Sequence, residues 1–188
     1  MKNARIIFLL FTLVLSVMAQ SPCPPCRNQQ ISTTNATTRN RGFGTYDIPS
    51  AVFTPITTTD IYLNRVAVTS DNQLYGASSQ ELYSINTNTG ISTLIGNFGR
   101  YMQNMAFGPN GVLYGLDFDN NFCEININTA AVSTLFTLDG FVDLANGMVY
   151  DPITELFYAS AEPGNGSGDS NLITISLDGT WTSLARGP

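Results

Sequence analysis

Residues 66–76 read Val66-Ala-Val-Thr-Ser-Asp-Asn-Gln-Leu-Tyr-Gly76, and the same pattern returns twice along the chain. The second copy is Met105-Ala-Phe-Gly-Pro-Asn-Gly-Val-Leu-Tyr-Gly115. The third, with one extra residue, is Met148-Val-Tyr-Asp-Pro-Ile-Thr-Glu-Leu-Phe-Tyr-Ala159. Self-similarity at a fixed period is typical of proteins that stack copies of one small unit. The sequence therefore predicts a repeat protein.

Each repeat contains four short segments that are rich in β-branched and aromatic residues and bounded by turn-forming residues, which is typical of β-strands. The predicted strands are 65–68, 74–78, 82–86 and 91–95, then 104–107, 112–117, 122–126 and 132–137, then 147–150, 156–161, 171–176 and 180–185. Hairpin turns are predicted at Gly90, Asn110-Gly111 and Asp178-Gly179, because glycine and asparagine accept a positive φ. No segment has apolar residues at helical spacing over a useful length.

Four strands in about 42 residues is the period of a propeller blade. The predicted fold is all-β and β-propeller-like, with three four-stranded antiparallel blades over 61–99, 100–140 and 141–186, inside a repeat region at 61–188. Residues 42–60 are predicted as a partial or divergent β unit, with strands at 46–48 and 52–57, the second at an edge because of Pro55. Tyr75, Tyr114 and Tyr158 fall at equivalent positions, where packing between blades is expected.

Two segments resemble a known class of domain. Leu74-Tyr-Gly76 and Leu82-Tyr-Ser-Ile-Asn-Thr-Asn-Thr-Gly-Ile-Ser-Thr-Leu-Ile-Gly96 are similar to the blades of extracellular β-propeller repeat domains in secreted and adhesin-like surface proteins. The resemblance covers roughly residues 61–186. It implies a propeller architecture, and it implies no functional residues.

Three blades do not close a ring, because propellers use about 4–8 blades. Three explanations stay open. The chain is a fragment whose missing blades lie downstream, or two chains form a homodimer with a six-bladed ring, or residues 42–60 supply a fourth blade.

The N-terminus has the pattern of a secretory signal peptide over residues 1–19. Lys2 and Arg5 precede an apolar run at 6–17, and Ala19 provides a small residue for cleavage. That run has 12 residues, fewer than the roughly 20 that a spanning helix needs. The prediction is a protein that is secreted or at the cell surface, without a membrane segment after cleavage. Residues 20–41 are predicted to be a disordered polar linker, and Asn35 in this linker begins a glycosylation sequon.

Charge and composition exclude several functions. The 188 residues include 8 basic and 14 acidic residues, and removing Lys2 and Arg5 leaves a net charge near −8. Such a surface disfavours nucleic acid and anionic membranes as partners, because both are bound through Lys and Arg. The chain has no histidine, which excludes Ser-His-Asp catalysis and histidine-ligated metals.

Cys23, Cys26 and Cys123 are candidates for disulfide formation in an oxidising compartment. The Cys23-Pro-Pro-Cys26 motif is predicted to form a local or interchain disulfide rather than a redox centre, since it lies in the linker. Cys123 is predicted to be a small buried residue in a strand. Its pairing with Cys23 or Cys26 is the alternative.

Three further segments are candidates for function. Asp117-Phe-Asp119-Asn-Asn121 is predicted to be a solvated hairpin tip, with a calcium loop as the alternative, although Phe122 and Asn128 stand where such a loop needs Gly and Glu. Residues 162–169 form a glycine-rich insertion with a second sequon at Asn165, and the alternatives are a glycosylated surface loop and a ligand-contacting loop. Trp181 is expected to pack in an outer strand, because the spacing around it does not fit the Asp-box of sialidase-type propellers.

No catalytic, cofactor-binding or metal-ligating set is predicted. We therefore expect a non-enzymatic protein that acts in extracellular binding or adhesion, with an extracellular protein or a glycan as partner. The first alternative is a carbohydrate-active enzyme that uses Asp117 and Asp119. The second is a structural module of an extracellular coat.

Overall fold

The structure is a computed structural model that describes residues 42–47, 50–58, 61–139, 143–163 and 171–186. Its strands are β1 (Gly42–Asp47), β2 (Val52–Thr58), β3 (Arg65–Val68), β4 (Leu74–Ser78), β5 (Glu81–Ile85), β6 (Ser92–Asn97), β7 (Met102–Phe107), β8 (Leu113–Asp117), β9 (Asn121–Ile125), β10 (Val132–Thr137), β11 (Asp143–Asp151), β12 (Leu156–Pro163), β13 (Asn171–Ile175) and β14 (Trp181–Arg186). One 3-10 turn, η1, spans Pro109–Gly111.

The strands form three four-stranded antiparallel sheets, each ordered as in the sequence. We call them blade 1 (β3–β6), blade 2 (β7–β10) and blade 3 (β11–β14). Strands β1 and β2 form a separate two-stranded antiparallel sheet. The predicted class, an all-β propeller-like fold with three four-stranded blades and an incomplete ring, is confirmed.

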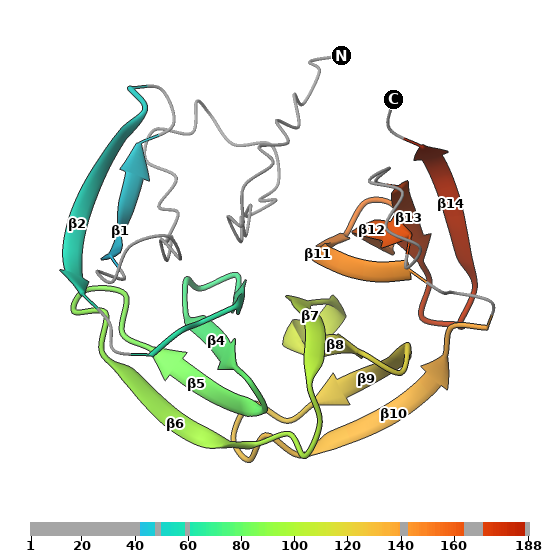
Figure 1. Cartoon of the computed structure of the whole chain (residues 1–188), viewed down its shortest axis with the longest axis horizontal. Coiled ribbons are helices and arrows are strands. Elements are labelled where there is room, and N and C mark those ends of the chain that lie inside the picture. The colour runs from blue at the N-terminus through green and yellow to red at the C-terminus, as the bar shows by residue number, and fades with distance from the viewer. Residues whose placement is uncertain (1–41, 48–49, 59–60, 140–142, 164–170, 187–188) are drawn as a thin grey trace.

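The blades lie side by side around a common centre and form an open ring (Figure 1). Strands β6, β10 and β14 run along the perimeter, and β2 continues this perimeter beyond blade 1 (Figure 1). The two-stranded sheet therefore stands where the outer half of a preceding blade would lie. The ring is open between this sheet and blade 3.

The strand registers show that the repeats are equivalent in space. Tyr75 pairs with Ala67, Tyr114 with Ala106 and Tyr158 with Val149, at the same place in the three blades. The Tyr75 ring packs against Phe107 of blade 2 at 5.5 Å between centroids. The predicted packing between blades is thus confirmed for Tyr75, and for Tyr114, which contacts a ring of blade 3.

Most strand boundaries agree with the prediction to within two residues, and the main errors lie at irregular pairings. β1 begins at Gly42 rather than residue 46, and its register with β2 shifts between Phe43 and Gly44. β11 begins at Asp143 rather than residue 147, and its register with β12 shifts between Ala145 and Gly147. Each of these β-bulges lies before the predicted start of its strand, in a stretch without a run of the β-branched and aromatic residues from which the strands were predicted.

The predicted turns are present. Asn110 and Gly111 have φ values of 57° and 71°, which is the pattern of a type I′ turn. Gly90 and Gly179 have φ values of 70° and 91°. In the β5–β6 turn, the Asn86 side-chain oxygen accepts hydrogen bonds from two backbone N–H groups, at 3.0 and 3.1 Å, and Asn126 repeats these contacts in blade 2.

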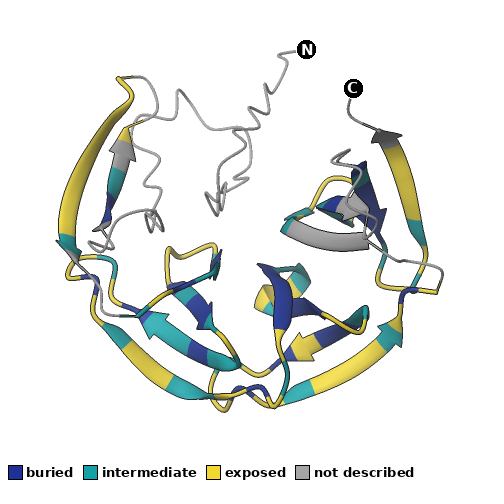
Figure 2. Cartoon of the chain, viewed as in Figure 1, coloured by how far each residue is buried: buried dark blue, intermediate teal, exposed yellow. Residues whose placement is uncertain are grey.

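Buried apolar side chains of neighbouring blades pack together. The perimeter strands, in contrast, are largely exposed (Figure 2). The core between blades 2 and 3 is built on two buried phenylalanines, Phe122 and Phe157, whose centroids are 5.1 Å apart. The core between blades 1 and 2 contains Leu82, Met105 and Leu113. The fold is therefore held by packing of one blade face on the next.

Several predicted features lie outside the described residues: the signal peptide 1–19, the linker 20–41, Cys23, Cys26, Asn35, Asn165 and most of the 162–169 insertion. Within the part of the chain that the structure describes, no helix is long and apolar enough to cross a membrane.

Candidate functional site

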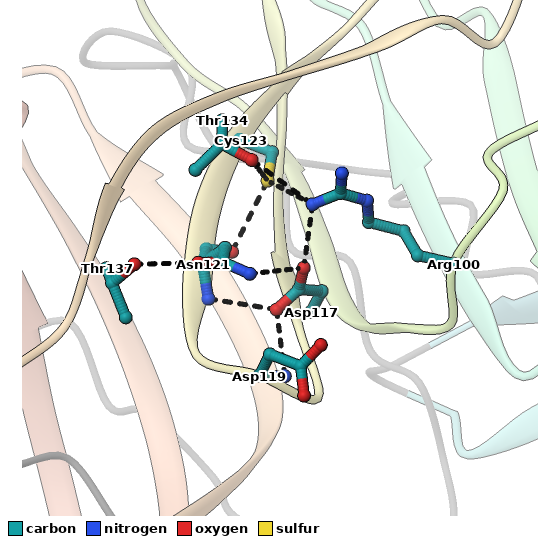
Figure 3. Close-up of polar contacts among 7 residues, drawn as sticks. All are labelled: Arg100, Asp117, Asp119, Asn121, Cys123, Thr134 and Thr137. Carbon is teal, nitrogen blue, oxygen red and sulfur yellow. Dashed lines mark hydrogen bonds and ion pairs between the residues drawn. The ribbon is translucent and has the colours of Figure 1, made fainter.

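Among the described residues, the largest network of hydrogen-bonded polar side chains lies at one end of blade 2. It joins the β6–β7 connection to the tip of the β8–β9 hairpin and to strand β10 (Figure 3). Its side chains are Arg100, Asp117, Asp119, Asn121, Cys123, Thr134 and Thr137.

Asp117 is the centre of this cluster. Its Oδ1 accepts hydrogen bonds from the backbone N–H groups of Asp119 and Asn121, both at 2.9 Å. Its Oδ2 accepts from the Asn121 side-chain amide at 2.9 Å and from Arg100 at 3.0 Å. The residue is only 2% exposed, so the prediction of a solvated carboxylate is wrong for Asp117. The hairpin turns tightly around this carboxylate and shields it from solvent.

Arg100 approaches the cluster from the connection before β7. Its Nη1 donates to Asp117 and also to Thr134 Oγ1, at 3.1 Å. The Arg100 side chain is 37% exposed, and its second terminal nitrogen points away from the other drawn residues (Figure 3). The ion pair and the threonine thus hold the guanidinium in one place, while part of it remains accessible.

Two further residues support this arrangement. Thr137 donates a hydrogen bond of 2.7 Å to the Asn121 side-chain oxygen, which fixes the amide that binds Asp117. Cys123 adjoins the cluster, with its Sγ 3.9 Å from Arg100 Nη1. Its side chain is buried, and its thiol is not in a disulfide. Burial raises the pKa of the Cys123 thiol, so the thiol is poorly suited to nucleophilic chemistry. The prediction that Cys123 is buried in a strand is confirmed.

Two exposed aromatic residues adjoin members of the cluster in sequence. Tyr101 directly follows Arg100 and is 55% exposed, and Phe118 directly follows Asp117 and is 53% exposed. The last cross-strand pair of this ladder is Met102 with Asp117. Tyr101 directly precedes β7 and Phe118 directly follows β8, so both residues lie at the same end of the ladder. This end of the ladder thus carries two exposed aromatic residues that adjoin Arg100 and Asp117 in sequence.

The Asp117 carboxylate is engaged within the cluster itself. The Asp117 oxygens accept four hydrogen bonds, two from backbone N–H groups of the hairpin and two from the side chains of Asn121 and Arg100. Asp119 is exposed at the tip. No group of three metal-ligating side chains occurs among the residues that the structure describes.

The remaining described candidate is Trp181. It begins the outer strand β14, packs against the core between blades 2 and 3, and donates a 3.0 Å hydrogen bond to the Asp139 carbonyl oxygen. The expectation that it packs in an outer strand is confirmed.

Sequence reasoning identified Asp117, Asp119 and Asn121 but missed Arg100, Tyr101, Phe118 and the two threonines. Arg100 lies 17 residues from Asp117, and neither repeat periodicity nor a spacing motif connects them. The sequence did offer one signal: Arg100 is the only basic residue between positions 66 and 185.

Comparisons with known proteins support the fold. No protein-family model and no curated protein matches the sequence. Solved structures do match. A structural genomics protein of unknown function from Bacteroides thetaiotaomicron has 19% identity and a TM-score of 0.58, over 83% of this chain and 40% of that one. TolB from Acinetobacter baumannii has 12% identity and a TM-score of 0.57, over 83% and 40%.

An auxiliary nutrient binding protein from Bacteroides ovatus has 16% identity and a TM-score of 0.55, over 79% of this chain and 37% of that one. The chain thus spans about two fifths of the length of these structures. Identities this low show the fold alone, and the shared fold is the β-propeller.

Proposed function

We propose that this chain is a secreted, non-enzymatic binding protein and that Tyr101, Phe118 and Arg100 contact an extracellular glycan. One observation carries the proposal. Two exposed aromatic residues lie at the end of the β7–β8 ladder, and they adjoin in sequence an arginine and the buried carboxylate that holds its guanidinium. Secretion is inferred from the signal-peptide pattern of residues 1–19.

Exposed aromatic rings suit the apolar C–H faces of sugars. A large ring in contact with water exposes apolar surface that a ligand can cover, and it loses little side-chain entropy when the ligand binds. Tyr101 adds a hydroxyl group that donates and accepts hydrogen bonds. A sugar stacked here would keep its hydroxyls free for the neighbouring polar groups.

Arg100 and Asp119 supply those polar groups. The guanidinium carries several N–H donors, and the ion pair with Asp117 fixes its direction before a ligand arrives. Asp119 is exposed and offers carboxylate acceptors at the same hairpin tip. Donors and acceptors beside an apolar platform match the alternation of C–H and O–H groups on a sugar ring.

The carbohydrate-active alternative fits the geometry less well. It assigns catalysis to Asp117 and Asp119, but Asp117 is buried under the hairpin and all of its hydrogen bonds are internal to the cluster. A general acid or base must reach a proton on the substrate within hydrogen-bonding distance. Asp117 could do so only after the hairpin tip opened.

A glycan array tests the proposal. The full chain, expressed by a secretory route, should bind a defined subset of glycans, and Tyr101→Ala and Phe118→Ala should each reduce that signal at least tenfold. Tyr62→Ala is the matched control, since Tyr62 is an exposed tyrosine before the first strand of blade 1. Binding that survives both substitutions, or that is lost equally with Tyr62→Ala, would contradict the proposal.

A further inference from the structure

The four perimeter strands that the structure describes, β2, β6, β10 and β14, each contain a β-bulge. In β10, Thr134 pairs with Cys123 and Phe136 pairs with Phe122, so Leu135 is an extra residue without a partner across this ladder. The ladders of β2, β6 and β14 with their neighbouring strands skip one residue in the same way. The four extra residues are Ile56, Ile95, Leu135 and Leu184.

The bulge has the same position in all four sheets. On the neighbouring strand, the residue paired directly after the bulge is large and apolar, and it is buried in three of the four sheets. These residues are Phe43, Leu82, Phe122 and the half-buried Leu172. The bulge is therefore a repeated feature of the perimeter, like the hairpin turns of the blades.

Packing of the extra side chain does not explain why the bulge recurs. Ile56, Leu135 and Leu184 are 37%, 42% and 51% exposed. Ile95 is half-buried at the margin of the core between blades 1 and 2. Because three of the four side chains are exposed, the shared consequence of the extra residue lies in the backbone of the strand.

The perimeter strands need protection of some kind, because each is an outer edge of its sheet (Figure 1). An edge strand presents free N–H and C=O groups to which a strand of another molecule can pair, and charged side chains or proline commonly prevent this. Strands β2, β6 and β10 contain no charged residue, and Pro55 is the single proline of the four strands. Strand β10 also lacks glycine, so its composition is that of a segment prone to intermolecular pairing.

We propose that the repeated bulges keep the uncharged perimeter of the ring from pairing with strands of other molecules. An extra residue bends the strand, increases its twist and interrupts the even spacing of its free N–H and C=O groups. A straight strand can then no longer align with this edge. The inference does not depend on the proposed glycan binding, because it concerns the outer side of the perimeter strands.

Deleting Leu135 tests the proposal. The pairs on the two sides of the bulge, Thr134 with Cys123 and Phe136 with Phe122, would become consecutive, so the deletion leaves the rest of the register unchanged. In the full chain, the mass measured by light scattering should rise to at least twice that of the wild type at equal concentration. Infrared spectra should show added intermolecular β-sheet. Leu135→Ser is the matched control, since it keeps the extra residue, and its mass should equal that of the wild type.

A second change separates edge pairing from misfolding. Ser133 is exposed on β10 and pairs with Glu124, so Ser133→Lys adds a charge to the straightened edge without a clash of like charges. Combined with the deletion, it should return the mass to that of the wild type.

Deletion of Ile95 in β6 and of Leu184 in β14 repeats the test at two other edges. A cooperatively folded deletion variant with the mass of the wild type would overturn the proposal. So would equal association of Leu135→Ser, or association that persists with Ser133→Lys. Loss of cooperative unfolding in all three deletion variants would assign the bulges to folding itself and would overturn it as well.

Discussion

The Phe157 ring of blade 3 meets the Tyr114 ring of blade 2 edge-on, with 5.2 Å between the ring centroids. Phe157 also contacts Phe122 and Tyr150, with centroid distances of 5.1 and 4.9 Å, and it is fully buried. This cluster joins two successive repeats, so the packing of one blade on the next depends on it.

Replacing Phe157 with alanine should therefore destabilise the protein strongly. A buried phenylalanine truncated to alanine costs about 3–5 kcal/mol through lost burial and the cavity that remains. Phe118→Ala removes the same ring from an exposed position and should change stability by about 0.5 kcal/mol or less. Urea unfolding measures both, and equal losses would contradict the assigned core.

Asp117→Ala should also destabilise the fold, because it removes the acceptor for two backbone N–H groups and leaves Arg100 without its partner. Leaving buried hydrogen-bond donors without their acceptor costs about 1–3 kcal/mol, and the partly exposed Arg100 adds little to that cost. Asp119→Ala, at the exposed tip of the same hairpin, should cost far less. If the two variants had the same unfolding midpoint, the role of Asp117 in holding the β8–β9 hairpin would be refuted.

Glu155→Gly should stabilise the protein. Glu155 has a φ of 58°, a conformation that is unfavourable for residues with a Cβ, and the equivalent place in the first hairpin of blade 2 holds Gly111 at 71°. The β5–β6 turn closes in the same way, through a hydrogen bond from the fifth N–H to the first carbonyl oxygen, and it has Gly90 there at 70°. The gain should be about 0.5–1 kcal/mol. The opposite type of substitution, Gly90→Ala in the β5–β6 turn, should destabilise the protein, since a Cβ there would lie 2.3 Å from Thr57 Cγ2. A lower melting temperature for Glu155→Gly would contradict the turn geometry.

The folded state should lose stability in acid, and part of that loss should come from protonation of Asp151. Hydrogen bonds from Ile153 and Thr154 lower the pKa of this carboxyl below its ordinary value of 3.8. The folded protein then holds the proton more weakly than the unfolded chain, so the stabilisation is complete above pH 3.8 and disappears as pH falls through the lower folded pKa. Asp151→Asn should lose this component. Melting curves of the two proteins between about pH 2 and 6 measure the difference, and parallel pH profiles would count against it.

The fold could be predicted because its signals are local. Asn110-Gly111 and Gly90 specify turns through their backbone preferences, and the repeated Leu-Tyr-Gly segments place a strand in each of the first two blades. The β-bulges near Phe43 and Asn146 could not be predicted, because an extra residue in one strand leaves the composition unchanged and only shifts the register.

The site was harder to predict, because its contacts join segments that are distant in sequence. In the sequence, Asp117 cannot be told from other aspartates in turns. Its partner Arg100 comes from the connection before β7, and Arg100 is held in turn by Thr134 of β10. The exposure of Tyr101 and Phe118 likewise depends on where blade 2 ends. Aromatic residues of the same types are buried elsewhere in the blade, as Tyr114 and Phe122 show.

We propose that Tyr101, Phe118 and Arg100 bind a glycan and leave it chemically unchanged. The most direct measurement is calorimetric titration of the strongest glycan from the array into the full chain, followed by mass spectrometry of the recovered glycan. We predict saturable binding with one site per chain, at least tenfold weaker in Tyr101→Ala, and recovery of the glycan intact. Cleaved glycan, or an affinity unchanged by Tyr101→Ala, would contradict the account.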